Sequence, residues 1–173
     1  MTHRTPAIAM VIALVAASFA VRAEEDKVAL KNPDELKKML PEKAEGFKLD
    51  KPQTLRYGAG DEAVSMVTLT GADKETDRSL SLMINDTGMG SRWEAIQQMQ
   101  DMTLETDEMS MKSVKIEGVG AMQVIDKNAE TVTFSIPVNG YLVTATMEGT
   151  KDPKPLTTIL ESMDWKALKA QRK

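Results

Sequence analysis

Hydrophobic and polar residues alternate along much of the chain, a pattern that predicts β-strands with one buried face. In the clearest segment, residues 79–85, every second position is Leu or Ile. Two earlier strands are expected between Thr54 and Thr70, joined through the turn residues 58–61. The remaining alternating segments are residues 119–126, 130–138 and 141–147.

The last two of these segments are separated by Asn139-Gly140. Asn-Gly between alternating runs predicts a β-hairpin, because both residues accept the positive φ of a type I′ turn. The C-terminal part of the sheet is therefore expected to contain an antiparallel pair closed by this turn.

Helical signals occur at the start, middle and end of the chain. Asn32-Pro33 predicts a capped helix that stops at Pro41, and a second helix is expected over about 91–103. A final helix is expected from about Pro153, capped by Asp152 or a neighbour. Its apolar stripe consists of Leu156, Ile159, Leu160, Met163 and Ala167.

Together these elements predict one α+β domain over residues 24–173, with an antiparallel sheet of about six strands and helices packed on it. The order from Met39-Leu40-Pro41 and Gly46-Phe47 through strands, a middle helix, more strands and a final helix resembles the PsbP/Mog1-like family of small exported bacterial proteins. The resemblance implies an α/β/α sandwich. It lies in element order and assigns no functional residue.

The first 23 residues have the composition of a signal peptide. His3 and Arg4 precede an apolar run from Ala7 to Ala17, which is shorter than the roughly 20 residues that span a bilayer. Cleavage is expected before Glu24, or two to three residues earlier, after Ala20. The chain has no cysteine for a lipid anchor or a disulfide, so we expect a periplasmic or secreted protein without a membrane span.

Charge argues against nucleic acid as a partner. The whole chain has a formal net charge of −4, which becomes −6 once Arg4 and Arg22 leave with the signal peptide. Phosphate binding needs clustered basic residues, and the one such cluster lies at the C-terminus. We interpret it as a solvated helix end, with an acidic partner or membrane surface as the alternative: Lys166, Lys169, Arg172 and Lys173.

The chemistry of most enzymes is missing. The single histidine is His3, inside the predicted signal peptide, so the mature chain has neither His nor Cys. Catalytic Ser-His-Asp and Cys-His arrangements and the usual zinc sites are thereby excluded. Carboxylate catalysis and calcium binding stay open in principle but have no sequence signal, and we expect a protein that is not an enzyme and has no cofactor.

Residues 84–95 have the order strand, glycine turn, helix start that phosphate-binding loops use. The third glycine of a dinucleotide loop is absent, and Trp93 occupies its place. Ser91 and Glu94 form a capping box, and Gly88 and Gly90 serve the turn. We therefore prefer a structural interpretation of this segment to a phosphate site.

Methionine is abundant, with 13 in the chain, and several lie close together in its middle. Helical spacing favours packing for most of them, because methionine fills irregular gaps in cores. The alternative is a Cu(I) site, since thioethers are soft ligands that prefer this ion. Its candidate ligands are Met99, Met102, Met109 and Met111. Met109 and Met111 are the two least explained by packing, because they fall in the polar link between the predicted middle helix and the strand at residues 119–126.

Hydroxyl side chains form a second unusual feature of the predicted hairpin. The alternation puts them opposite its apolar face, so they should form one patch, made of Thr131, Thr133, Ser135, Thr144 and Thr146. A solvated β-surface explains this patch, since Thr suits strands, and a docking surface for a protein or polymer is the functional alternative. The sequence thus favours an exported, non-enzymatic binding or interaction module, with Cu(I) binding as the alternative.

Overall fold

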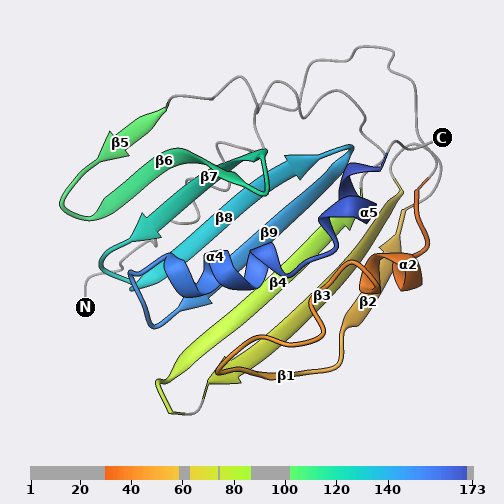
Figure 1. The fold of residues 1–173 in the computed structure, drawn as a ribbon, viewed down its shortest axis with the longest axis horizontal. Helices are drawn as coiled ribbons and strands as arrows, with labels where there is room; N and C mark the ends of the chain where they lie inside the picture. The colour runs from red at the N-terminus through yellow and green to blue at the C-terminus, as the bar shows by residue number, and fades with distance from the viewer. Residues whose placement is uncertain (1–29, 59–62, 74, 87–101, 171–173) are drawn as a thin grey trace.

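The computed structural model describes residues 30–58, 63–73, 75–86 and 102–170. Within these ranges, nine strands form one antiparallel sheet, and three short helices lie on the side of the sheet that faces the viewer in Figure 1. The predicted signal peptide, residues 1–23, lies outside the described ranges. No helix in those ranges combines the length and hydropathy that crossing a membrane requires.

The strands pair in an order that differs from their order in the chain. Strand β9 lies between β4 and β8, so the sheet runs β1-β3-β4-β9-β8-β7-β6-β5, with β2 also paired to β3. The bounds are β1 Lys48–Leu49, β2 Gln53–Tyr57, β3 Val64–Asp73, β4 Arg78–Asp86, β5 Thr103–Glu105, β6 Met109–Ile116, β7 Val119–Asp126, β8 Thr131–Val138 and β9 Tyr141–Glu148.

The α+β interpretation is confirmed in outline, but the sheet has more strands than the six expected. The largest error is the segment taken for a polar link, which forms β6 and pairs with β7 along its whole length. Thr103, expected at the end of a helix, instead begins β5. Met102 is not helical either, and the rest of that predicted helix, residues 91–101, lies outside the described ranges.

The predicted hairpin between β8 and β9 is confirmed. Asn139 and Gly140 have φ values of 45° and 79°, as a type I′ turn requires. The Asn139 side chain also donates a hydrogen bond to the Leu168 carbonyl, 3.3 Å away. The turn therefore both reverses the chain and contacts the C-terminal helical segment.

The start of the first helix is confirmed, but its end is not, because the helix stops at Lys37 and not at Pro41. Helix α2, Pro33–Lys37, begins after Asn32, whose side chain accepts a hydrogen bond from the Asp34 N–H at 3.0 Å. Asn32 thereby satisfies a backbone N–H group that the first turn of a helix leaves without an intrahelical partner.

The single C-terminal helix was predicted wrongly, because two helices occupy this segment. Helix α4, Lys154–Glu161, has Pro153 as its N-cap, and Asp152, the residue before it, accepts from the Lys154 N–H at 3.0 Å. The second helix, α5, Trp165–Lys169, has Asp164 as its N-cap. Trp165 Nε1 donates to the Leu160 carbonyl at 2.7 Å, which holds the two helices at the break.

The hydrophobic core lies between the sheet and these helices. Alternate residues of the central strands point into it, and the apolar face of α4 covers them with Leu156, Ile159 and Leu160. The largest fully buried side chains of the sheet are Leu69, Leu80, Leu82, Ile84, Phe134, Ile136, Tyr141 and Met147. The opposite side of the sheet, which we call the open face, has none of the three described helices on it (Figure 1).

Candidate functional site: the open face of the sheet

The predicted hydroxyl patch is confirmed at its centre. Thr133 lies opposite Thr146, and Ser135 lies opposite Thr144, on neighbouring strands β8 and β9. The hydroxyl oxygens of Thr133 and Thr146 are 3.3 Å apart and share a hydrogen bond. All four side chains are half-buried by their neighbours, so the patch is part of the packed surface of the sheet.

The sheet registers extend this patch far beyond the hairpin. Residues directly opposite one another form rows across the strands, because side chains on one face of a sheet line up across the pairing direction. One row runs Leu104, Met111, Val124, Thr133, Thr146, Ser81 and Thr70. The next row runs Ser113, Met122, Ser135, Thr144, Met83, Thr68 and Gln53.

Neither row contains a charged residue between β5 and β3, although 28% of the residues in the chain are charged. The first row ends at Asp50, whose carboxylate accepts from the Thr70 hydroxyl at 2.8 Å. Charged residues return in the flanking positions. Asp126 and Glu148 lie beside the first row, and Lys115 lies beyond the second. Thr131, the fifth residue of the predicted patch, is opposite both acidic residues and is only 8% exposed, so it belongs to the margin.

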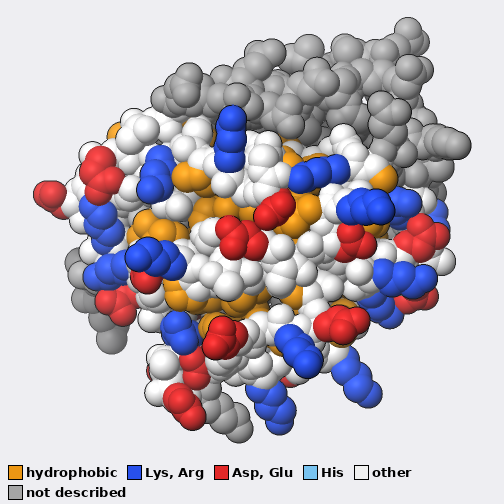
Figure 2. Space-filling view, viewed as in Figure 1, with side chains coloured by type: hydrophobic (Ala, Val, Ile, Leu, Met, Phe, Trp, Pro, Cys, Tyr) orange, Lys and Arg blue, Asp and Glu red, His pale blue; other side chains and the backbone are white. Residues whose placement is uncertain are grey.

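The helix-covered side of the molecule has a different surface. Figure 2 shows Lys, Arg, Asp and Glu side chains distributed over that side, with apolar side chains visible between them. Mixed charges of this kind are typical of a solvated surface. The uncharged rows of the open face are therefore a property of one side of the sheet.

The predicted methionine ligands are partly brought together. Met109 and Met111 lie on the open face in β6, and Met102 directly precedes β5. Met99 lies outside the described ranges. The sequence analysis missed Met122 of β7, which shares the open face with Met111, because only the pairing of distant segments places them side by side.

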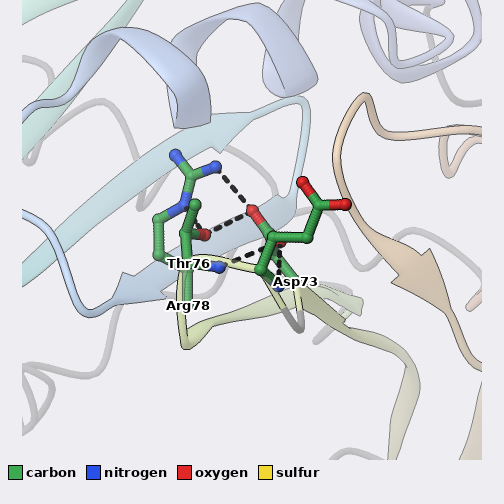
Figure 3. Close-up of polar contacts among 4 residues, drawn as sticks. Asp73, Thr76 and Arg78 are labelled. Carbon is green, nitrogen blue, oxygen red and sulfur yellow. Dashed lines mark hydrogen bonds and ion pairs between the residues drawn. The ribbon is translucent and has the colours of Figure 1, made fainter.

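A polar network at the end of β3 was not predicted (Figure 3). Asp73 is 6% exposed, and its Oδ1 accepts hydrogen bonds from the backbone N–H groups of Glu75 and Thr76. Its Oδ2 accepts from the Thr76 hydroxyl and pairs with Arg78 Nη2 at 2.7 Å. The Thr76 hydroxyl and then Arg78 lower the pKa of Asp73 from 3.8 to about 2.

This network closes the turn between β3 and β4 and fixes Arg78 over the ring of Phe47, 5.4 Å from its centroid. Each carboxylate oxygen of Asp73 already accepts two hydrogen bonds within the turn. We therefore assign the network a structural role.

A second buried polar group lies at the other end of these strands. Ser65, Asp86 and Tyr141 are opposite one another on β3, β4 and β9, and each is 0% exposed. The Asp86 carboxylate accepts the backbone N–H of Lys31 at 2.9 Å, which attaches the segment before α2 to the sheet. The glycine turn that follows Asp86, with the capping box and phosphate-loop residues considered above, lies outside the described ranges.

The basic C-terminal cluster is described only in part. Lys166 and Lys169 lie in α5, and Lys169 Nζ donates to the Glu117 carbonyl and lies 5.9 Å from the centroid of the Trp165 ring. Arg172 and Lys173 lie outside the described ranges. Lys169 is thus used to attach α5 to the turn between β6 and β7.

Among the described residues, no three His, Cys, Asp or Glu side chains come together as a metal site would require. No family model, curated protein or solved structure matches the chain. The arrangement of the residues themselves is therefore the basis for the functional proposal.

Proposed function

We propose that this chain is an exported, non-enzymatic binding module whose open face docks a partner protein. The observation that supports the proposal is the pair of uncharged rows across the sheet. Lys, Glu and Asp are depleted at the centre of protein interfaces, whereas Met is enriched, and interface rims are polar. The rows match this pattern in their lack of charge and in three Met, though not in three Ser, which interfaces also deplete, and Asp126, Glu148 and Lys115 lie at their margins.

The size of the uncharged area suits the centre of a protein interface. Seven strands spaced about 4.8 Å apart, with two rows that each occupy about 7 Å along the strands, give about 500 Å². A standard interface buries about 800 Å² on each partner, including its rim. A partner with a flat, uncharged surface, such as another sheet, fits these dimensions, because sheets pack face to face.

The docking proposal is tested by placing charge in the centre of the rows. Thr133→Lys/Thr144→Lys introduces two cations where the partner would exclude water. Thr54→Lys/Thr158→Lys makes the same two changes at exposed positions on the helix side, since Thr54 is opposite Val67 and Thr158 lies in α4. Proteins cross-linked to each form in native extract are identified by mass spectrometry, and the candidate is purified and titrated.

We expect one protein to bind the original chain and the helix-side variant equally, and to bind the open-face variant at least tenfold more weakly. A second copy of this chain counts as that protein, and sedimentation of each form detects it. Equal binding to all three forms, no partner that titrates, or a partner that proves to be a polysaccharide would each contradict the proposal.

The alternative proposal for the open face is the α/β/α sandwich predicted from the sequence. A second helical layer from this chain would then cover the rows, and Thr133→Lys/Thr144→Lys would bury two unpaired charges within the fold. The free energy of unfolding of this variant therefore separates the two proposals. A loss similar to that of Thr54→Lys/Thr158→Lys supports a separate partner, and a loss of several kcal/mol supports a covering layer.

Export is tested separately, by the mass of the protein purified from an expressing bacterium. We expect a chain that starts at Glu24, or at Val21 if cleavage follows Ala20. A chain that retains the signal segment after secretion, or one that stays in the cytoplasm, would overturn the exported part of the proposal.

A further inference from the structure

Three methionines converge at the β5 end of the open face. The Met102 carbonyl accepts the Ser113 N–H at 3.1 Å, which continues the pairing of β5 with β6 by one residue and places Met102 beside Ser113. Met122 lies on the other side of Ser113, in β7. Met111 is two residues from Ser113 on β6, so its side chain is on the same face and diagonal to both.

The spacing of these positions suits three ligands around one ion. With strands about 4.8 Å apart and about 6.8 Å between alternate residues, a single point lies about 5 Å from all three Cα positions in the plane of the sheet. Methionine has a long, unbranched side chain with three rotatable bonds, so its sulfur can reach such a point. Met102 is 41% exposed, which gives an ion access from solvent.

We propose that Met102, Met111 and Met122 form a binding site for a soft monovalent metal ion, with Cu(I) as the ligand. Thioether sulfur selects Cu(I), whereas carboxylate and water suit hard cations such as magnesium and calcium. The immediate neighbours on the open face, Ser113 and Val124, are uncharged. Three neutral ligands with no carboxylate among these neighbours favour a monovalent ion, because no negative charge offsets the desolvation of a divalent one. Lys115, two residues from Ser113 on the same face, adds a positive charge that further disfavours a divalent ion.

The proposal changes the ligand set that the sequence suggested. Met109 also lies on the open face, but it is a further row away from Ser113 and lies opposite Asp126. The equidistant point is about 12 Å from the Met109 position by the same strand dimensions. Met122 replaces it, and Met109 becomes a control.

The test is a competition titration of the purified protein with Cu(I) against a chromophoric Cu(I) chelator, without oxygen and with a reductant present. Silver(I) serves as a second probe, since it is soft and monovalent but is not oxidised under these conditions. The site variant is Met111→Leu/Met122→Leu. The matched controls are Met109→Leu and Met66→Leu/Met83→Leu, which removes two other methionines of the open face. Thermal unfolding without metal verifies that each variant is folded.

We expect one Cu(I) per chain, an affinity at least tenfold lower in the site variant, and unchanged affinity in both controls. X-ray absorption of the Cu(I) form should show a shell of three sulfur atoms. Equal affinity in the site variant, or no competition by the original chain, would overturn the site. Partner docking is tested without metal, and the Thr133→Lys/Thr144→Lys variant should retain Cu(I), so the two proposals succeed or fail independently.

Discussion

Leu82 and Met83 are neighbours in β4 that point to opposite sides of the sheet, and they provide the sharpest test of the fold. Leu82 is 0% exposed in the core, whereas Met83 is half-buried on the open face between Thr68 and Thr144. Replacing each with alanine shortens a large side chain at almost the same place in the chain. The difference between the two losses measures how much of each face the folded chain covers.

The expected losses follow from burial. Leu82→Ala removes three carbon groups worth about 0.8 kcal/mol each, or about 2.4 kcal/mol. The cavity left in a core that cannot collapse raises this to about 3 to 4 kcal/mol. Met83→Ala removes a side chain that already contacts solvent and leaves no closed cavity, so we expect a loss of about 1 kcal/mol.

The assay is urea unfolding, in which the midpoint shifts at constant slope if only stability changes. Thermal unfolding should agree, because about 1 kcal/mol corresponds to about 2–4 °C in a chain of this size, which gives about 10 °C for Leu82→Ala. Equal losses for the two variants would refute the reasoning. They would mean that the chain itself covers the open face, and the docking proposal would fail with it.

Three further predictions concern other parts of the structure. Hydrogen bonds lower the pKa of Asp73 from 3.8 to about 2, so its carboxylate stabilises the native state at neutral pH. This stabilisation is lost as the pH falls from about 4 to 2. The urea midpoint should therefore fall less steeply over that pH interval in Asp73→Asn than in the original chain. Gly140→Ala places a side chain at a φ of 79° and should lower the free energy of unfolding by about 1 to 2 kcal/mol, as measured in urea, and an unchanged midpoint would argue against the type I′ turn. Trp165→Phe removes the 2.7 Å hydrogen bond to the Leu160 carbonyl, which keeps the Met163 N–H as a donor at 3.1 Å, so thermal unfolding should show a loss of about 0.5 to 1.5 kcal/mol.

The sequence predicted the elements whose signals are local. The Asn139-Gly140 turn and the alternation on either side of it determine β8 and β9 without reference to the rest of the chain. The same alternation was enough to assign Thr133 and Thr144 to one face. It did not show that the hydroxyl rows continue onto β4 and β3, because that depends on the pairing of β9 with β4.

Strand β6, next to the edge strand β5, was missed because it buries little on either face. In β6 each face carries two apolar and two polar residues, so no hydrophobic period of two is visible: Met109, Met111, Ser113 and Lys115 alternate with Ser110, Lys112, Val114 and Ile116. The break between α4 and α5 was missed for a different reason. Met163 and Ala167 continue the apolar stripe of α4 in sequence, but Asp164 caps a new helix between them.

The position of β9 between β4 and β8 also determines how the chain must fold. Strands β1 to β4 pair with near neighbours in sequence, and so do β5 to β9, while one seam of eight residue pairs between β4 and β9 joins the two groups. Asp86 and Tyr141 are the pair in that seam with the smallest sequence separation, and the whole of β5 to β8 lies between them in the chain. Ordering a loop of this length costs entropy before the seam contributes any stability. Folding rate should therefore be limited by this non-local closure, and the protein would complete its sheet only when two locally formed halves meet.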